Sequence, residues 1–107
     1  MTSPLASNLR RVRELLTPEG AWSQGAYAKD ASGRYAPCGA VDKTVVSWCL
    51  SGATVAAIGD LDERIAARKI INDFVGGNII KWNDHPSRTQ PQVLAMLDRA
   101  IERAERG

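Results

Sequence analysis

The sequence predicts an all-α protein, a compact domain of four helices with a packed loop or a short β-hairpin between the first and second helices. Segment 42–58 is apolar around most of its circumference, so a helix there would be largely buried. Three further segments carry apolar residues at helical spacings and are bounded by residues typical of helix ends. With 107 residues, the chain is expected to form a single helical domain over 1–107.

The first helix is predicted near the start of the chain. Ser3 and Pro4 are of the types preferred at the N-cap and at the first helical position. Pro18 disfavours helix in the residue before it, so we expect the helix to end within 17–20. The apolar face of this helix comprises Leu5, Leu9, Val12 and Leu16.

Residues 21–40 lack helical periodicity and are rich in Gly, Ala, Ser and Pro. They nevertheless contain Trp22, Tyr27 and Tyr35, which are half of the aromatic residues, so we expect a packed loop. Within it, residues 30–33 match a type I turn with glycine last. A short hairpin between 27–29 and 34–36 is therefore predicted.

The second helix is predicted over 42–58, with Asp42 as its N-cap. Its small residues recur at spacings of three and four, so one face would let another backbone approach closely, while Trp48 adds bulk elsewhere. The small residues are Cys49, Gly52, Ala53 and Ala56.

The third helix is predicted to follow a tight corner. Gly59 is expected to end the helix before it, and Asp60 with Glu63 has the capping-box pattern. Gly76 and the glycine after it mark the end of the third helix. Its apolar series is Ala67, Ile70, Ile71, Phe74 and Val75.

The connector 78–86 is predicted as a turn or a short helical segment that carries Ile79, Ile80 and Trp82 inward. Thr89 and Gln92 then form a second capping-box pattern, which predicts the start of the last helix. The apolar stripe of that helix is Val93, Leu94, Leu97, Ala100, Ile101 and Ala104.

The net charge of the chain is mild. It has 14 basic and 12 acidic residues, a formal charge of +2, which disfavours nucleic acid as a partner. The first residues lack the apolar segment of a signal peptide, and the longest apolar run, 54–58, is far too short to cross a bilayer. We therefore predict a cytoplasmic protein without a membrane partner, in which Cys38 and Cys49 are thiols.

Cys49, Asp84 and His85 are the residues of this chain that would have to form a nucleophilic dyad or triad. A reactive thiolate needs an open, electropositive setting, whereas Cys49 lies in the most apolar segment, where burial would raise the pKa of its thiol. No catalysis is therefore expected. A metal site is not expected either, because Cys38, Cys49 and His85 lack the paired spacing of zinc ligands, and no cofactor motif is present.

The segment Trp82-Asn83-Asp84-His85, together with Arg88, is the candidate for binding. Polar side chains beside an aromatic residue, in a connector between two helices, are a common arrangement at binding sites. The alternative, which is favoured, is structural: Asn83 and Asp84 would bond to the backbone of the turn while Trp82 fills the core.

Several motifs follow one another along the chain: W-x-Q-G-x-x-A-x-D-x-x-G from Trp22, W-C-L-x-G-A from Trp48, W-N-D from Trp82 and T-x-x-x-V from Thr89. This order resembles a family of small bacterial and phage proteins of unknown function. The resemblance lends no activity, cofactor or catalytic residue. It implies that one spatial unit is formed by Trp48, Cys49, Trp82, Asn83 and Asp84.

The leading functional hypothesis is a non-catalytic module that binds another protein, with a role as a phage or mobile-element accessory or inhibitor protein as its extension. The first alternative is a small hydrolase or transferase that uses Cys49 and His85. The second is weak binding of nucleic acid through Arg10, Arg11 and Arg13. The sequence leaves the identity of the partner and homo-oligomerisation open.

Overall fold

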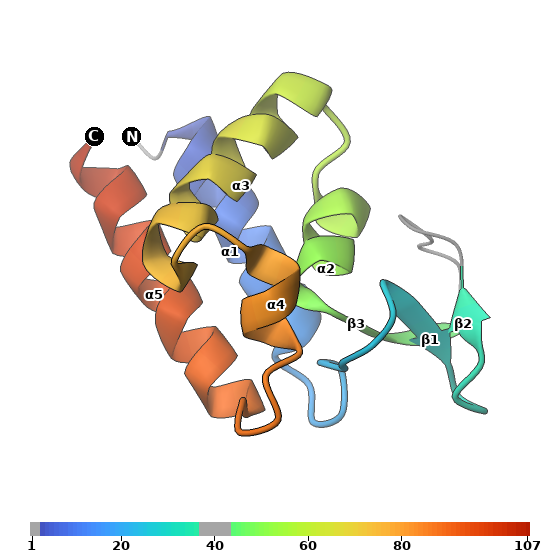
Figure 1. Cartoon of the computed structure of the whole chain (residues 1–107). Helices are drawn as coiled ribbons and strands as arrows, with labels where there is room; N and C mark the ends of the chain where they lie inside the picture. Colours follow the sequence, from blue (N-terminus) through green and yellow to red (C-terminus); the bar gives the residue numbers. More distant parts are fainter. Residues whose placement is uncertain (1–2, 37–43) are drawn as a thin grey trace.

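A computed structural model of the chain describes residues 3–36 and 44–107. Within these residues the fold is α+β, with five helices and a three-stranded antiparallel sheet (Figure 1). The prediction of an all-α domain of four helices is therefore wrong. In chain order the elements are α1 (Pro4–Leu16), β1 (Ala28–Asp30), β2 (Tyr35–Ala36), β3 (Val45–Trp48), α2 (Leu50–Ala57), α3 (Leu61–Val75), α4 (Ile79–Asn83) and α5 (Gln90–Arg106).

The main error concerns segment 42–58, which was predicted as one helix. Val45–Trp48 form strand β3, and α2 begins only at Leu50. Val46 is exposed between buried neighbours, as the alternating side chains of a strand require. A short apolar run does not distinguish a buried strand from a buried helix, and two successive valines favour the strand. The predicted N-cap Asp42 lies outside the described residues.

The predicted short hairpin is confirmed. Strands β1 and β2 are antiparallel, with Ala28 opposite Ala36 and Lys29 opposite Tyr35. Strand β3 pairs with the other edge of β1, so the strand order is β2-β1-β3. The hairpin is thus extended by a strand that the sequence pattern assigned to a helix.

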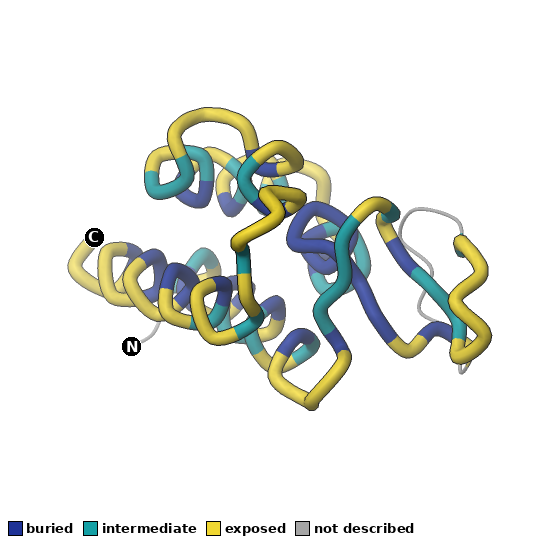
Figure 2. The backbone as a smooth tube through the Cα atoms, turned by 60° about the horizontal axis from the view of Figure 1, so that its bottom comes forward, coloured by how far each residue is buried: buried dark blue, intermediate teal, exposed yellow. Residues whose placement is uncertain are grey.

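Helix α1 lies against α2, α3 and α5 and forms the centre of the helical part (Figure 1). Its predicted apolar face is confirmed, since Leu9, Val12 and Leu16 are fully buried. Helix α5 runs antiparallel to α1, and the buried residues of both helices face the interior (Figure 2). None of the helices in the ranges 3–36 and 44–107 combines the length and the apolar content needed to cross a membrane.

The starts of α1, α3 and α5 and the end of α3 carry the predicted capping residues. Ser3, Asp60 and Thr89 each accept, through a side-chain oxygen, the backbone N–H three residues further on. Thr89 and Gln92 form a complete capping box, and Gly76 ends α3 with φ of 83°. These N-caps pair N–H groups that have no partner within the helix. Each N-cap lies only three residues from the N–H that it binds, so the sequence alone could predict it.

Helix α4 is the short helical segment predicted in the connector. Ile79 is buried as expected, but Ile80 is 43% exposed, so its prediction as a core residue is wrong. Trp82 is half-buried at the edge of the core. A helix of five residues turns one narrow face inward, and Asn83, which is fully buried, completes that face.

The hairpin approaches α2 closely at Gly52. A Cβ atom at this buried position would lie 1.9 Å from the carbonyl oxygen of Tyr27. The same carbonyl accepts a hydrogen bond from the backbone N–H of Cys49 at 3.2 Å. The expected close approach of another backbone to the small-residue face is therefore confirmed at Gly52, and only glycine fits there.

Gly52→Ala should lower the free energy of unfolding by about 3 kcal/mol, because the added methyl group overlaps a backbone atom that is fixed by its own hydrogen bond. Gly59→Ala is the matched control, since a Cβ at that position would meet nothing within 4 Å. The control should lie within about 1 kcal/mol of the wild type. Urea unfolding measures both, and equal stability of the two variants would refute the close approach.

Asp30 organises the turn between β1 and β2. Its Oδ1 accepts hydrogen bonds from the Ser32 hydroxyl (2.6 Å), the Ser32 backbone N–H (2.9 Å) and the Arg34 backbone N–H (3.0 Å). The Ser32 hydroxyl, followed by the Arg34 N–H, holds the pKa of the Asp30 carboxyl below its ordinary value. This hydrogen bonding favours the ionised side chain in the folded hairpin.

The hairpin should therefore lose stability in acid. The pKa of the Asp30 carboxyl is lower in the folded chain than in the unfolded chain. The stabilisation by its ionised form is therefore fully present above the unfolded pKa of about 4, and it is lost as the pH falls through the folded pKa. Ser32→Ala removes the largest cause and should raise the pKa of Asp30. Carboxyl ¹³C shifts against pH measure this pKa, and identical titrations of the wild type and the variant would exclude the assigned cause.

Candidate functional site

Asn83, the last residue of α4, places a fully buried amide where three segments of the chain meet. Its Oδ1 accepts hydrogen bonds from Trp22 Nε1 (2.6 Å) and from the backbone N–H of Leu50 (2.9 Å). Its Nδ2 donates to the carbonyl oxygen of Ser23 (3.1 Å) and to Asp84 Oδ1 (2.9 Å). Two donors and two acceptor positions are all used, so the amide is buried without an unsatisfied polar atom.

The chain after Trp22 is bound along the end of α4. Gln24 Nε2 donates to the carbonyl oxygens of Asn83 (2.9 Å) and His85 (2.8 Å). The Gly25 backbone N–H donates to Asp84 Oδ1 at 3.0 Å. These bonds join residues 59 to 61 positions apart in the sequence, so they fix the tertiary arrangement and not a local turn.

The same segment also pairs with β3. The backbone N–H of Trp48 donates to the Ala21 carbonyl oxygen (2.8 Å), and the Trp48 carbonyl oxygen accepts from the Ser23 N–H (2.9 Å). These two bonds place Trp22 beside Trp48 in a parallel β-bridge. Segment 21–25 is thus held between β3 and α4. We call this arrangement the Asn83 junction. It comprises residues 21–25, residues 48–50 where β3 passes into α2, and residues 83–85.

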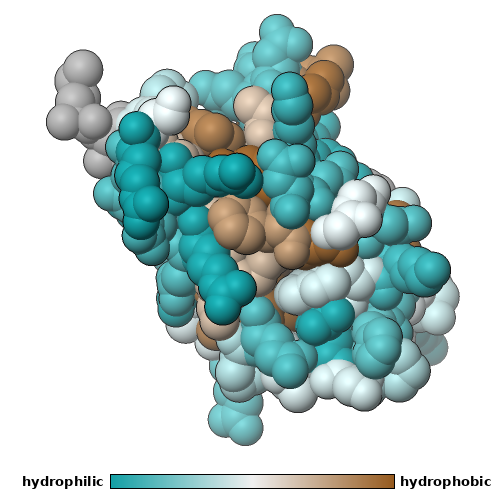
Figure 3. Space-filling model, turned by 60° about the vertical axis from the view of Figure 1, so that its left-hand side comes forward, coloured by the Kyte–Doolittle hydropathy of each residue, from teal (hydrophilic) through white to brown (hydrophobic). Residues whose placement is uncertain are grey.

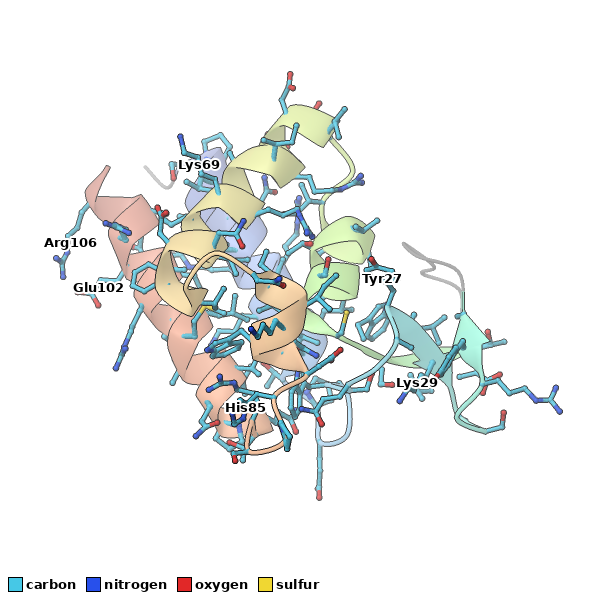
Figure 4. All side chains as sticks on the ribbon, in the orientation of Figure 1. Tyr27, Lys29, Lys69, His85, Glu102 and Arg106 are labelled. Carbon is cyan, nitrogen blue, oxygen red and sulfur yellow. The ribbon has the colours of Figure 1, made fainter. Side chains whose placement is uncertain are left out.

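An open pocket of about 290 Å³ lies beside the Asn83 junction. Three large side chains that border it are well exposed: Tyr27 (42%), Tyr35 (75%) and Ile80 (43%). Figure 4 shows Tyr27 between the sheet and α2. The pocket is lined by Gly25, Ala26, Tyr27, Tyr35, Ala36, Cys49, Ile80, Asn83 and Asp84.

The structure divides the predicted binding segment 82–85, with Arg88, into two parts. Asn83 and Asp84 line the pocket. Trp82 is covered by the Arg88 guanidinium, 3.8 Å from the ring centroid, and Arg88 Nε donates to the Trp82 carbonyl oxygen at 3.0 Å. Trp82 and Arg88 therefore hold the turn. Asn83 borders the pocket, but its side chain is used for structural hydrogen bonds, and Asp84 is exposed beside it.

Cys49 and His85, the proposed nucleophile and base, lie in different surroundings. Cys49 is buried, lines the pocket and caps α2, with its sulfur accepting the Gly52 N–H at 3.2 Å. His85 is exposed in the turn after α4, outside the pocket lining, and its Nδ1 accepts the Ser87 N–H at 3.0 Å (Figure 4). Burial of Cys49 was predicted, but its position at a helix start was not.

Acidic, histidine and cysteine side chains do not gather into a group of three or more able to hold a metal ion in the part of the chain that the structure describes. Cys38, one of the three residues weighed as zinc ligands from the sequence, lies outside that part. The described residues thus offer no metal centre to which a function could be assigned.

The N-terminal arginines are engaged within the helical part. Arg10 pairs with Glu105 and Arg13 with Asp98, both at 2.6 Å, which links α1 to α5. Arg11 donates to the side chain of Asn8 on its own helix. Two of the three cations considered for nucleic-acid binding are thus already paired with carboxylates.

A second hollow, of about 380 Å³, lies between α3 and α5. On the face shown in Figure 3, hydrophilic side chains border a narrow apolar strip. The charges of this hollow are largely matched internally, since Arg103 pairs with Asp73 at 3.8 Å and Arg106 with Glu102. The Arg103 guanidinium also lies 5.2 Å from the Phe74 ring centroid. This hollow therefore leaves fewer groups available to a ligand than the pocket does.

Gln24, Gly25 and Tyr27 were not predicted as parts of the site. Gln24 and Gly25 belong to the W-x-Q-G motif, but their hydrogen-bond partners lie about sixty positions away, at Asn83 and Asp84. The order of the motifs was therefore the only sequence signal for their role. The spatial unit implied by the resemblance is present in part. Cys49, Asn83 and Asp84 share the pocket, and Trp48 reaches Asn83 through Trp22.

The fold and the site define a small α+β protein in which a buried amide joins three segments beside an open, mainly apolar pocket. The chain belongs to a family of unknown function, DUF6197, whose model matches residues 1–103. The predicted resemblance to such a family is thereby confirmed, whereas a phage origin stays a prediction. The search of curated proteins and the search of solved structures each gave no match.

Asn83→Asp should lower the free energy of unfolding by about 3 kcal/mol, because a carboxylate cannot donate to Ser23 and would face the Asp84 carboxylate in a buried site. Asn78→Asp, at the N-cap of the same helix, keeps a good cap and should stay within about 0.5 kcal/mol of the wild type. Urea unfolding followed by tryptophan fluorescence compares them. Equal losses would show that the Asn83 amide has no special role.

Proposed function

We propose that the protein is a non-catalytic module that binds another protein, and that the pocket beside the Asn83 junction is its contact site. The observation that carries this proposal is the clustering of exposed apolar side chains, those of Tyr27, Tyr35 and Ile80, around one hollow. Exposed apolar patches rimmed by polar groups are typical of interaction sites.

The pocket is well supported from below, which favours binding. Hydrogen bonds fix the lining residue Asn83 and tie Gln24 to its carbonyl oxygen, so a partner would have little ordering of this surface to compensate. The close approach of the Tyr27 backbone to Gly52 also fixes the position of Tyr27 in the lining. Rigid residues around a hydrophobic hollow are the arrangement in which an anchor side chain of a partner binds strongly.

The volume of the pocket also favours a protein partner. At about 290 Å³ it lies at the small end of the range for small-molecule sites, roughly 300–1,000 Å³. Apolar surface continues outside it on Tyr35, which is 75% exposed. A single anchor side chain in the pocket, with flanking residues over Tyr35, would use both features.

The non-catalytic part of the proposal is supported by the settings of Cys49 and His85. The sulfur of Cys49 is buried and accepts a helix N–H, whereas His85 belongs to a separate exposed turn. We expect the module to meet its partner in the cytoplasm, and a role as a phage or mobile-element accessory or inhibitor protein would suit such a module.

Ile80→Ser should abolish binding of the partner at the pocket, because it removes apolar contact area without adding charge. Ile65→Ser is the matched control, since Ile65 is a similarly exposed isoleucine (55%) on α3, outside the pocket lining. A photo-crosslinking residue in place of Tyr35 reports contact in cells, and the same residue in place of Leu61 is the control probe.

The proposal expects protein adducts from the Tyr35 position that disappear with Ile80→Ser and persist with Ile65→Ser. Adducts that appear equally from both probe positions, or that ignore Ile80→Ser, would contradict it. Adducts formed only between two copies of this chain would show that the pocket serves self-association, and they would contradict binding of a different protein.

A further inference from the structure

Asp84 presents a carboxylate oxygen at the mouth of the pocket. Its Oδ1 accepts hydrogen bonds from the Gly25 N–H (3.0 Å) and from Asn83 Nδ2 (2.9 Å), which fix the orientation of the carboxylate. Among residues 3–36 and 44–107, the ion pairs all lie within and between α1, α3 and α5, and none includes Asp84. The exposed carboxylate therefore keeps its second oxygen available to a ligand.

Apart from Asn83, the side chains that line the pocket with this carboxylate are mostly apolar. Tyr27 and Ile80 line the pocket together with Asp84, and the other lining side chains include two alanines and Cys49. A cation that binds Asp84 beside such groups is partly withdrawn from water once the pocket is filled, so the ion pair would be screened less than a pair on an open surface. The fixed carboxylate also needs little reordering to accept it.

Resting on the proposed function, we propose that the partner segment presents a large apolar side chain with a lysine or arginine within two residues of it. The apolar side chain enters the pocket, and the cation binds Asp84. An acidic segment is disfavoured, because it would place two carboxylates together at the mouth of an apolar pocket.

The test uses the full chain labelled with ¹⁵N and a panel of Gly-Ser peptides of equal length. Each peptide carries one leucine or phenylalanine and, one or two positions away, lysine, arginine, glutamine or glutamate. The Gly25 amide is a direct reporter, because it donates to the Asp84 carboxylate. Titration of the amide shifts gives the dissociation constant of each peptide.

Lysine and arginine peptides should bind the wild type at least about ten-fold more tightly than glutamine peptides, and they should shift the Gly25 amide. Asp84→Asn should remove this preference, since its amide oxygen can still accept from Gly25 and Asn83 but carries no charge. Asp62→Asn, an equal change of charge on α3 outside the pocket, should preserve the preference. Raised salt should weaken the lysine and arginine peptides selectively.

Two results would overturn the inference and are distinguishable from failure of the proposed function. Peptides that bind the wild type, lose binding with Ile80→Ser and show no preference for lysine or arginine would exclude the role of Asp84 while leaving the pocket as the contact site. Peptides that shift no pocket amide would exclude the apolar and cationic motif, and the crosslinking from Tyr35 would then decide the proposed function by itself.

Discussion

The structure depends on the buried amide of Asn83. Its Oδ1 receives the Leu50 N–H, which belongs to the first turn of α2 and has no acceptor within that helix. The same oxygen receives the indole N–H of Trp22, so the start of α2 and the segment before the hairpin share one acceptor on α4. Removing that acceptor would leave two donors unpaired at once, the Leu50 N–H among them in buried surroundings, so the amide stabilises the start of α2.

The parts of the fold that were predicted from sequence are those whose signals are local. The spacing of Leu9, Val12 and Leu16 identifies the buried face of α1 without knowledge of any other element. The caps at Asp60 and Thr89 are equally local, because each side chain bonds to a backbone N–H three residues away. For these elements propensity, pattern and capping agree, so tertiary structure only had to pack helices that the sequence had already delimited.

The parts that were missed are those decided by distant residues. Strand β3 exists because Trp48 pairs with Ala28 on one side and with the Ala21–Ser23 backbone on the other, and nothing within 45–48 reveals either neighbour. The candidate site shows the same limit. Asn83 and Asp84 could be selected as polar residues in a connector, but Gln24 and Gly25 bind them from about sixty positions away. A local pattern cannot report such pairs.

The structural role of segment 82–85 and its proposed binding role are compatible, because different groups would serve each. Two side chains are used for structure: the Trp82 ring lies beneath the Arg88 guanidinium, and the Asn83 amide makes four hydrogen bonds. Asp84 uses one carboxylate oxygen to hold Gly25 and exposes the other beside an apolar pocket. Structural bonds fix that carboxylate before any ligand arrives, so in the proposed binding this residue of the turn would act as a preorganised group. The stability of the junction and the geometry of the pocket mouth are therefore set by the same few contacts.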